Sequence, residues 1–148
     1  MELLLMKREH LDGVATLEQL CFGEPWSANA LEILLGDGAF ACVCTEENVV
    51  VGYGGMLSVL DEGQITNIAV HPDYRRQGYG RRVLEAMLEE ASNRGLCQIS
   101  LEVRASNLAA ITLYEQSGFV CVGRRRSFYR QPPEDALVMI RTAASDSE

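Results

Sequence analysis

Glycines and arginines between Arg75 and Arg82 form a pattern that suits the binding of a phosphate group. Gly78 and Gly80 flank Tyr79, and arginines occupy positions 75, 76, 81 and 82. The pattern of apolar residues predicts a strand before this segment and a helix after it. In that arrangement glycines let the backbone approach a ligand, and free amides at the helix N-terminus point at the anion. The sequence therefore predicts a phosphate-binding loop, with a plain turn and solvated arginines as the alternative.

Two familiar kinds of phosphate loop do not fit these residues. The segment from Gly78 to Val83 lacks the third glycine of a dinucleotide-binding fingerprint, and it lies in the middle of the chain. A P-loop requires a lysine followed by serine or threonine, and Lys7 is the only lysine.

The elements that must position this loop follow from hydrophobic periodicity. Apolar or alternating runs predict strands at residues 3–6, 39–44, 49–60, 64–70, 97–104, 119–122 and 136–140. Helical spacing predicts helices over residues 11–21, after a cap at Ser27, over residues 83–91 before Gly95, and from a cap at Ser106 or Asn107 to Gly118. This order predicts an α/β (α+β) fold in which helices pack on a mixed sheet.

Composition and charge exclude several classes of function. Thirteen basic against 21 acidic residues give a net charge of −8, which argues against general nucleic-acid binding. No apolar run approaches the roughly 20 residues of a membrane-spanning helix. Residues 1–6 are too short for a signal peptide. We therefore expect a cytoplasmic protein with one domain, residues 1–142, and a polar tail, residues 143–148.

Charge is distributed unevenly along the chain. Residues 1–67 hold two basic and eleven acidic side chains, whereas residues 68–148 hold eleven arginines and ten acids. This asymmetry fits an anion site in the second half and a cation-tolerant surface in the first. Ordinary solvated surface charge would explain it equally well.

The cysteines carry no metal-binding signature. Their spacing is not that of metal ligands, and the chain has only two histidines that could complete a metal site. The five cysteines are Cys21, Cys42, Cys44, Cys97 and Cys121. We interpret them as small buried hydrophobic residues in a reducing compartment, and we expect no metal site.

Longer motifs identify the family that this sequence resembles. The run Arg75-Arg76-Gln77-Gly78-Tyr79-Gly80 matches the Arg/Gln-x-x-Gly-x-Gly/Ala signature of the GCN5-related N-acetyltransferases, the GNAT family. Residues 67–74 resemble that family's strand into the loop. Further segments resemble one branch of the family, the RimI-type ribosomal-protein-alanine N-acetyltransferases. These are residues 21–27, 101–107, 110–119, 129 and 134–136. The similarity runs from the first expected helix to Ile140, nearly the whole chain, and implies the GNAT fold, a mixed, mostly antiparallel central sheet with helices on both faces.

The resemblance implies acetyl-CoA as co-substrate and assigns residues to it. Main-chain amides of the loop would hold the pyrophosphate, from residues Arg76, Gln77, Gly78, Tyr79, Gly80 and Arg81. The segment that would pair with the pantetheine arm, and offer an amide to the thioester oxygen, is Ile68, Ala69 and Val70. Asn107 would also contact the cofactor, whereas Arg75 is expected to shape the turn.

The RimI-type branch uses a glutamate as general base and a tyrosine as general acid, at positions that Glu102 and Tyr114 match. Each residue has an alternative when it is considered alone. A glutamate on a strand is most often solvated. Tyr114 shares helical spacing with Leu108 and Ile111, which favours core packing.

Acid–base chemistry favours an N-terminal amine as the nucleophile. An α-amino group with a pKa near 7.7–8 is about one tenth neutral at pH 7, whereas lysine, near 10.4, is less than one thousandth neutral. A glutamate near 4.3 is still some 3.5 units too acidic to take that proton freely. We therefore expect Glu102 to have a raised pKa or to act through a water molecule.

The resemblance therefore predicts acetyl transfer to the N-terminal alanine of a small-subunit ribosomal protein, without direct nucleic-acid or membrane partners. Residues 24–26 and 124–129 would flank the entering peptide. The alternative for the first segment is a rigid turn packed by Trp26, and for the second a solvated run of arginines at Arg124–Arg126. Two other functions stay open. One is an acetyltransferase for lysine side chains or small amines, and the other is a non-catalytic acyl-CoA-binding module.

Overall fold

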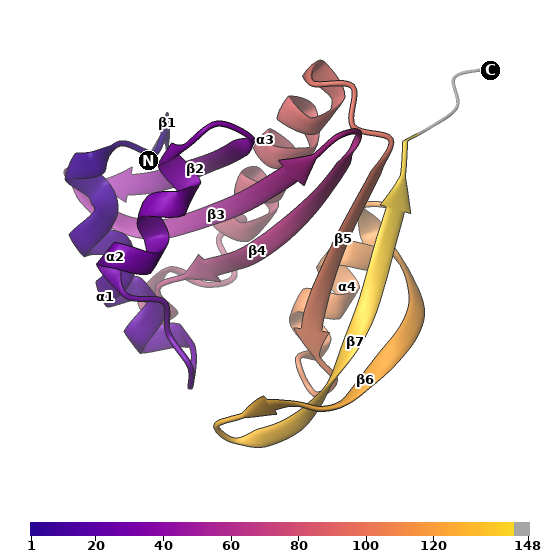
Figure 1. Cartoon of the computed structure of the whole chain (residues 1–148). Coiled ribbons are helices and arrows are strands. Elements are labelled where there is room, and N and C mark those ends of the chain that lie inside the picture. The colour runs from indigo at the N-terminus through magenta and orange to yellow at the C-terminus, as the bar shows by residue number, and fades with distance from the viewer. Residues whose placement is uncertain (144–148) are drawn as a thin grey trace.

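The computed structural model describes residues 1–143, so the polar tail expected at 143–148 lies outside this range except for Ala143. A seven-stranded sheet has the order β1-β2-β3-β4-β5-β7-β6 (Figure 1). Its strands are β1 (Glu2–Leu5), β2 (Ala39–Glu46), β3 (Val49–Val59), β4 (Glu62–Val70), β5 (Gln98–Arg104), β6 (Val120–Arg130) and β7 (Pro133–Thr142). Neighbouring strands are antiparallel except β4 and β5, which are parallel. The expected mixed, mostly antiparallel sheet is confirmed.

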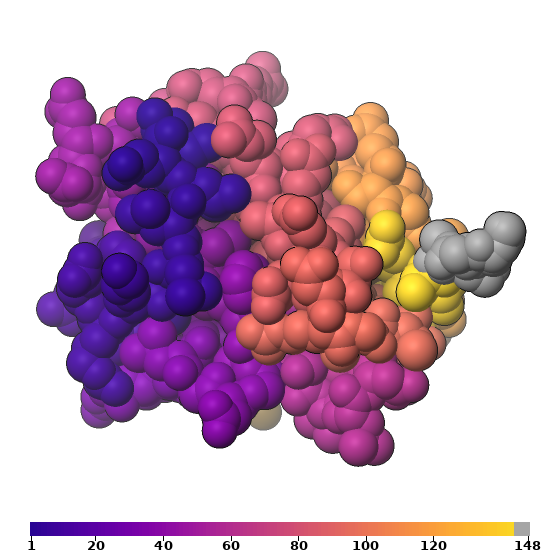
Figure 2. Space-filling model, turned by 90° about the horizontal axis from the view of Figure 1, so that it is seen from above, coloured from indigo at the N-terminus to yellow at the C-terminus, as the bar shows by residue number. Residues whose placement is uncertain are grey.

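Helices cover both faces of the sheet, as the resemblance implied. Helices α1 (Leu11–Cys21) and α2 (Ala28–Leu31) lie on one face, and α3 (Tyr79–Asn93) and α4 (Leu108–Gln116) lie on the other (Figure 1). The described residues also include short 3-10 helices at η1 (Arg8–His10), η2 (Glu32–Leu35) and η3 (Pro72–Tyr74). Each face has its own buried apolar cluster, one around α1 and one around α3. From above, N-terminal residues and C-terminal strands lie on opposite sides of the molecule (Figure 2).

Helix starts are set by local side chains or by glycine. Ser27 Oγ accepts a hydrogen bond from the Ala30 amide at 3.1 Å, which confirms the predicted cap of α2. Asn107 Oδ1 accepts one from the Ala110 amide at 3.2 Å, so Asn107 rather than Ser106 caps α4. Helix α3 has no capping side chain, and Gly78 occupies its N-cap position.

A bulge in β4 separates this strand from β5. Met56 pairs with Ile65 and Gly55 pairs with Asn67, so Thr66 is an extra residue in β4. A bulge bends its strand and increases the local twist. Strands β4 and β5 accordingly pair only through Glu62–Gln64 and Gln98–Ser100, and they diverge beyond that point (Figure 1). The edge of β4 that faces β5 is therefore open from Ile65 onward.

The last two strands are longer than the sequence indicated. Residues 124–126, expected between strands, belong to β6, and β7 begins at Pro133. Each strand is completed by backbone pairing with the other, which does not depend on apolar side chains. Charged residues are also well tolerated on an edge strand such as β6.

The prediction that all cysteines are buried is wrong for two of them. Cys42 and Cys44 are buried and Cys21 is half-buried, but Cys97 and Cys121 are exposed. Cys97 precedes β5, and Leu96 instead enters the core. Cys121 lies on β6, the edge strand of the sheet, most of whose side chains are exposed.

Candidate active site

The loop before α3 has the geometry of an anion site. Gly78 has φ +85°, a left-handed conformation that glycine adopts without strain, and a Cβ built there would meet no atom within 4 Å. The first helical hydrogen bond runs from the Arg82 amide to the Gly78 carbonyl at 3.0 Å. The amides of Tyr79, Gly80 and Arg81 precede it, so they point out of the helix end. Backbone donors and the positive end of the helix dipole therefore converge at this loop.

Side chains around the loop hold its shape. The Tyr79 hydroxyl donates to the Glu46 carboxylate, and this hydrogen bond is the main cause that raises the pKa of Tyr79 to about 12. Arg81 donates to Gln116 of α4. Arg75 Nε donates to the Val70 carbonyl at 3.1 Å, as expected for a residue that shapes the turn. Through these contacts the loop presents main-chain amides while several of its side chains anchor it to the protein.

The segment Ile68–Val70 lies on β4 just beyond the bulge. Its partners on β3 are Gly54, Tyr53 and Gly52, so one edge is fully paired. The opposite edge faces the gap toward β5, because β5 pairs with β4 only up to Gln64. An extended ligand arm would find backbone groups there that no strand pairs, as a further strand would, although the Val70 carbonyl already accepts from Arg75.

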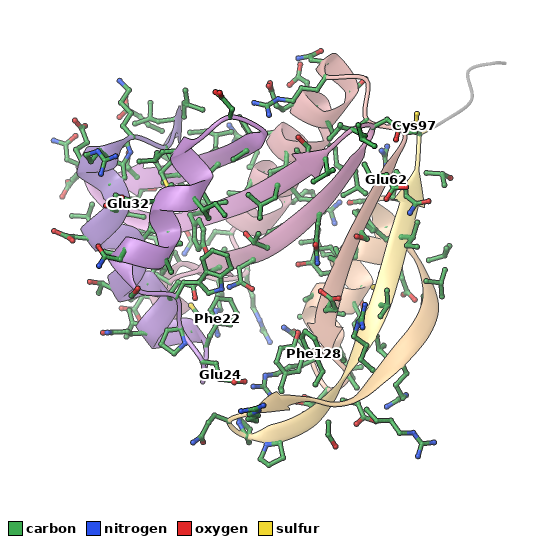
Figure 3. All side chains as sticks on the ribbon, viewed as in Figure 1. Phe22, Glu24, Glu32, Glu62, Cys97 and Phe128 are labelled. Carbon is green, nitrogen blue, oxygen red and sulfur yellow. The ribbon has the colours of Figure 1, made fainter. Side chains whose placement is uncertain are left out.

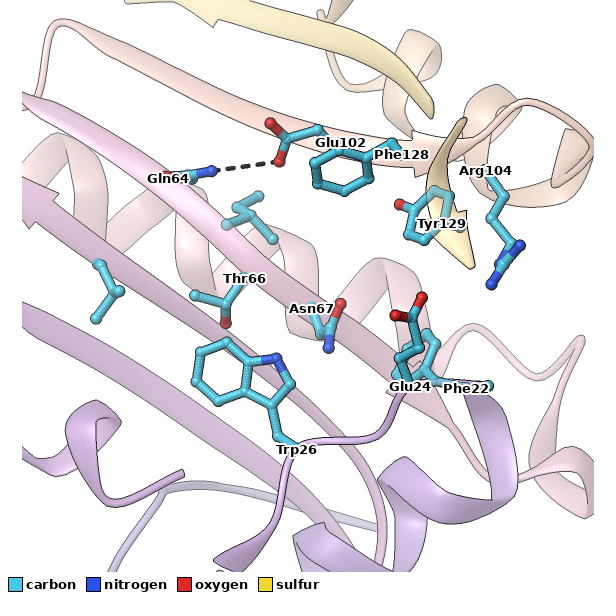
Figure 4. Close-up of a pocket in the computed structure, with 13 residues that line it drawn as sticks. Phe22, Glu24, Trp26, Gln64, Thr66, Asn67, Glu102, Arg104, Phe128 and Tyr129 are labelled. Atoms are coloured by element: carbon cyan, nitrogen blue, oxygen red, sulfur yellow. Dashed lines mark hydrogen bonds between the residues drawn. The ribbon is translucent and has the colours of Figure 1, made fainter. Parts of the chain in front are cut away.

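Two cavities lie along the gap between β4 and β5. The smaller, about 130 Å³, is lined by Ile68, Asn107, Tyr114 and others. The larger, about 430 Å³, extends from the gap toward the loop after α1 (Figure 4). Both cavities share residues from β4, β5 and β6, among them Asn67, Glu102 and Tyr129. The shared residues mark the junction where the two cavities meet.

Glu102 and Tyr114 both line the smaller cavity, so the fold brings together the two residues expected to catalyse. Glu102 accepts a hydrogen bond from Gln64 Nε2 at 3.3 Å and forms an ion pair with Arg125 Nε at 3.1 Å. Tyr114 is only 7 % exposed and also packs edge-on against Phe119. Burial, and then the neighbouring Tyr129, raise the pKa of Tyr114 well above its ordinary value. Tyr114 thus combines core packing with access to the cavity.

The larger cavity is bounded by the two segments that were expected to flank a peptide. Glu24 and Trp26 line it from the loop after α1, and Phe128 and Tyr129 line it from β6. Figure 3 shows Phe22 and Glu24 on one side of the opening and Phe128 on the other. The Glu24 carboxylate accepts a hydrogen bond from the Arg130 amide at 3.0 Å and joins the two walls.

Arg104 fixes the β6–β7 hairpin against β5. Its guanidinium lies 4.2 Å from the centre of the Tyr129 ring. It also donates to the carbonyls of Gln131 and Pro132 at 2.8 Å each, and to Glu134 at 3.2 Å. Burial is the main cause that raises the pKa of Tyr129 to about 12, so its hydroxyl remains protonated at neutral pH.

Sequence reasoning missed Glu18 and Asn67 as parts of the site, whereas Tyr129 belongs to a segment that was expected to flank the peptide. Glu18 is fully buried on α1 although it is charged. A signal was present, because Glu18 falls on the apolar stripe of Val14 and Cys21 at helical spacing. Asn67 had no such signal, since its position depends on the bulge in β4.

The described residues, 1–143, hold no group of three or more His, Cys, Asp or Glu side chains placed to bind a metal ion. Within the same range, no helix is both long and apolar enough to cross a membrane.

The model of the acetyltransferase (GNAT) family matches residues 11–119, and the chain belongs to this family. It is therefore an N-acetyltransferase, as its signature predicted. Among curated proteins, the [ribosomal protein bS18]-alanine N-acetyltransferase of Escherichia coli K12 is 40% identical over 125 residues, 83% of this chain and 84% of that protein. A putative enzyme of the same name from Bacillus subtilis strain 168 is 35% identical over 136 residues, 90% of each chain.

A solved structure agrees with these relatives. The crystal structure of the ribosomal-protein-S18-alanine N-acetyltransferase from Escherichia coli superposes with a TM-score of 0.88 and 34% identity. The superposition covers 99% of this chain and 97% of the Escherichia coli enzyme. The resemblance to the ribosomal-protein-alanine N-acetyltransferase branch is thereby confirmed.

Proposed function

We propose that this enzyme transfers the acetyl group of acetyl-CoA to the N-terminal α-amino group of a protein, the N-terminal alanine of ribosomal protein bS18, which would place the reaction in the cytoplasm. One observation carries the proposal. The free amides at the start of α3, the open edge of β4 and the cavity lined by Glu102 and Tyr114 adjoin one another, because Gly80 lies beside Val70 and Ile68 lines the cavity. The names of the relatives from Escherichia coli and Bacillus subtilis, both alanine N-acetyltransferases of ribosomal protein bS18, support the choice of substrate.

The residues along this path fit acetyl-CoA. The backbone amides of Arg76, Gln77, Gly78, Tyr79, Gly80 and Arg81 would hold the pyrophosphate at a helix end that carries no capping side chain. The unpaired edge of Ile68, Ala69 and Val70 would bind the pantetheine arm. Asn107 keeps its side-chain NH2 group for the cofactor, because its oxygen caps α4.

Glu102 would accept the proton that the α-amino group releases as it attacks the thioester. Gln64 and Arg125 hold its carboxylate at the junction of the two cavities. An ordered water between Glu102 and the amine would extend the reach of the carboxylate. Acetyl-CoA supplies an activated acyl group, and the open amides of β4 would stabilise the oxyanion that forms on it.

Tyr114 would donate its proton to the departing thiolate. Burial raises the pKa of Tyr114, so its hydroxyl is protonated at every physiological pH. A thiolate released into the same cavity loses hydration as well, and burial raises the pKa of a thiol in the same direction. Because the shared environment raises both pKa values, the difference between donor and acceptor does not widen by the full shift of Tyr114.

The substrate class is tested with a peptide panel and acetyl-CoA, read by mass spectrometry. We expect one acetyl group on the α-amine of a peptide that begins with alanine, and none on a matched peptide whose N-terminus is blocked and which contains lysine. Poor N-terminal substrates together with efficient lysine or polyamine substrates would contradict the proposal. Tight acetyl-CoA binding by calorimetry without turnover on any amine would instead indicate a binding module.

A further inference from the structure

Asn67 is placed at the junction of the two cavities by the bulge in β4. It is the residue directly after the extra residue Thr66, and a bulge redirects the side chains that follow it. Asn67 lines both cavities, as do Glu102 of β5 and Tyr129 of β6. A nucleophilic amine must reach the thioester at this junction, because it comes from the larger cavity and the acetyl group from the smaller. Asn67 and Glu102 are then polar groups on opposite walls.

A buried carboxylate holds one end of the Asn67 amide. Glu18 is 0% exposed, and its carboxylate accepts hydrogen bonds from the Trp26 amide at 2.9 Å, from Asn67 Nδ2 at 2.8 Å and from the Tyr53 hydroxyl. Burial, followed by the charge of Glu18, raises the pKa of Tyr53, so this hydroxyl stays protonated and donates. All three neighbours are donors, so Glu18 acts purely as an acceptor.

This network decides which atom of Asn67 faces the cavity. If the amide were flipped, its oxygen would lie against the Glu18 carboxylate, and two acceptors would face each other without a proton between them. The NH2 group is therefore held toward Glu18, and Oδ1 points toward the space between Phe128 and Tyr129 (Figure 4). Oδ1 is a pure acceptor aimed at the place where the substrate amine must arrive.

We propose that Asn67 Oδ1 accepts a hydrogen bond from the α-amino group of the substrate, and that Glu18 is a positioning residue that fixes Asn67 for this contact. The inference rests on the proposed acetylation of a protein N-terminus and names a residue that selects the amine. One N–H of the amine bonds to Asn67, and the proton to be lost is left for Glu102 on the opposite wall. The nitrogen is thereby held between the two strands.

The first experiment measures binding of an alanine-starting peptide to the complex of enzyme and CoA by calorimetry. The control ligand is the same peptide with a propionyl group in place of alanine, which keeps the methyl and carbonyl groups but lacks the amine. We expect Asn67→Leu to weaken binding of the alanine peptide by about 10- to 100-fold, the range for a hydrogen bond to a charged group. Binding of the propionyl peptide and the KM for acetyl-CoA should not change.

Glu18→Gln tests the positioning role without deleting any Asn67 atom. In this variant the side-chain oxygen of the glutamine still accepts from the Trp26 amide, and its NH2 group faces Asn67. The Asn67 amide then flips, so that its Oδ1 accepts from this NH2 group and its own NH2 group faces the cavity. The cavity then sees an NH2 donor, which repels an ammonium group. We expect a higher KM for the alanine peptide, an unchanged KM for acetyl-CoA, and little change in melting temperature. In the double variant the two losses should not add, since both act through one amide.

Two results would overturn the proposal. One is an Asn67→Leu enzyme that binds both peptides as tightly as the wild type does. The other is an equal loss of affinity for both peptides, which would assign Asn67 a structural role only. If the wild-type enzyme fails to acetylate N-terminal amines at all, the proposed function fails instead, and this outcome is seen before any variant is made.

Discussion

The two ends of the reaction path are built in different ways. The anion site at the start of α3 comes from consecutive residues, Arg76 to Arg81, and a left-handed glycine shapes it. The amine end is assembled from α1, the loop after it, β4, β5 and β6, through residues as far apart in the chain as Glu18 and Tyr129. A local motif tolerates changes elsewhere in the protein, whereas the assembled end depends on how the whole sheet bends. Damage to one end should therefore leave the other intact.

Glu102→Gln should have the largest effect, and only on the assembled end. Loss of a general base costs about 10²- to 10⁴-fold in kcat, and the glutamine side chain keeps the size and polarity of the site. Steady-state kinetics with an alanine-starting peptide measures the loss, and calorimetry should give an unchanged Kd for acetyl-CoA. Glu115→Gln, an exposed change on α4, is the matched control. A Glu102→Gln enzyme with normal kcat would remove the assigned role.

Tyr114→Phe should lower kcat by about 10²-fold, because water would replace the lost proton donor inefficiently. This is the lower limit of the rate loss typical when a general acid is removed. The ring still packs against Phe119, so the melting temperature should stay near that of the wild type. The measurement is single-turnover kinetics compared with a thermal melt. A slow enzyme with a strongly lowered melting temperature would instead indicate that Tyr114 serves the core.

Gly78→Val should produce the converse pattern, with damage at the local end. A β-branched residue at φ +85° is strained, and relief of that strain moves the loop amides. We expect the Kd for acetyl-CoA to rise about 10-fold or more. Gly95→Val is a close control, because Gly95 has φ +73°, has open space around it, and lies at the other end of α3. Equal Kd values for both variants would contradict the assignment of the anion site.

The smallest predicted effect is on the pH dependence of stability, at Asp135 in the hairpin that forms one wall of the assembled end. The backbone hydrogen bond from Ser127, followed by the contact with Arg124, holds the pKa of Asp135 below its ordinary 3.8. A lowered pKa stabilises the fold above 3.8, and this stabilisation is lost as pH falls below that value. Asp135→Asn should therefore lower the melting temperature slightly at pH 7 and less at pH 3. A difference that grows at acid pH would reverse the sign and refute the assignment.

The proposed anion site could be predicted from the sequence because its residues are neighbours in the chain. Two glycines and the following helical stripe specify a free helix N-terminus, whatever the rest of the fold does. The limits of β6 were not readable, since backbone pairing with β7 carries that strand through Arg124–Arg126. Burial of Cys97 and Cys121 was wrongly expected, because alternation along a strand does not reveal where the strand begins or whether anything covers its outer face.

By itself the sequence determined the order of the elements, the family, and the glycine loop proposed to hold phosphate, since these depend on local propensity and on short motifs. Only the tertiary structure decided which side chains share the junction of the cavities. One extra residue, Thr66, bends β4 away from β5, opens the gap, and turns Asn67 toward Glu18. A bulge arises from the pairing of two strands, so its effect appears only when both are folded together.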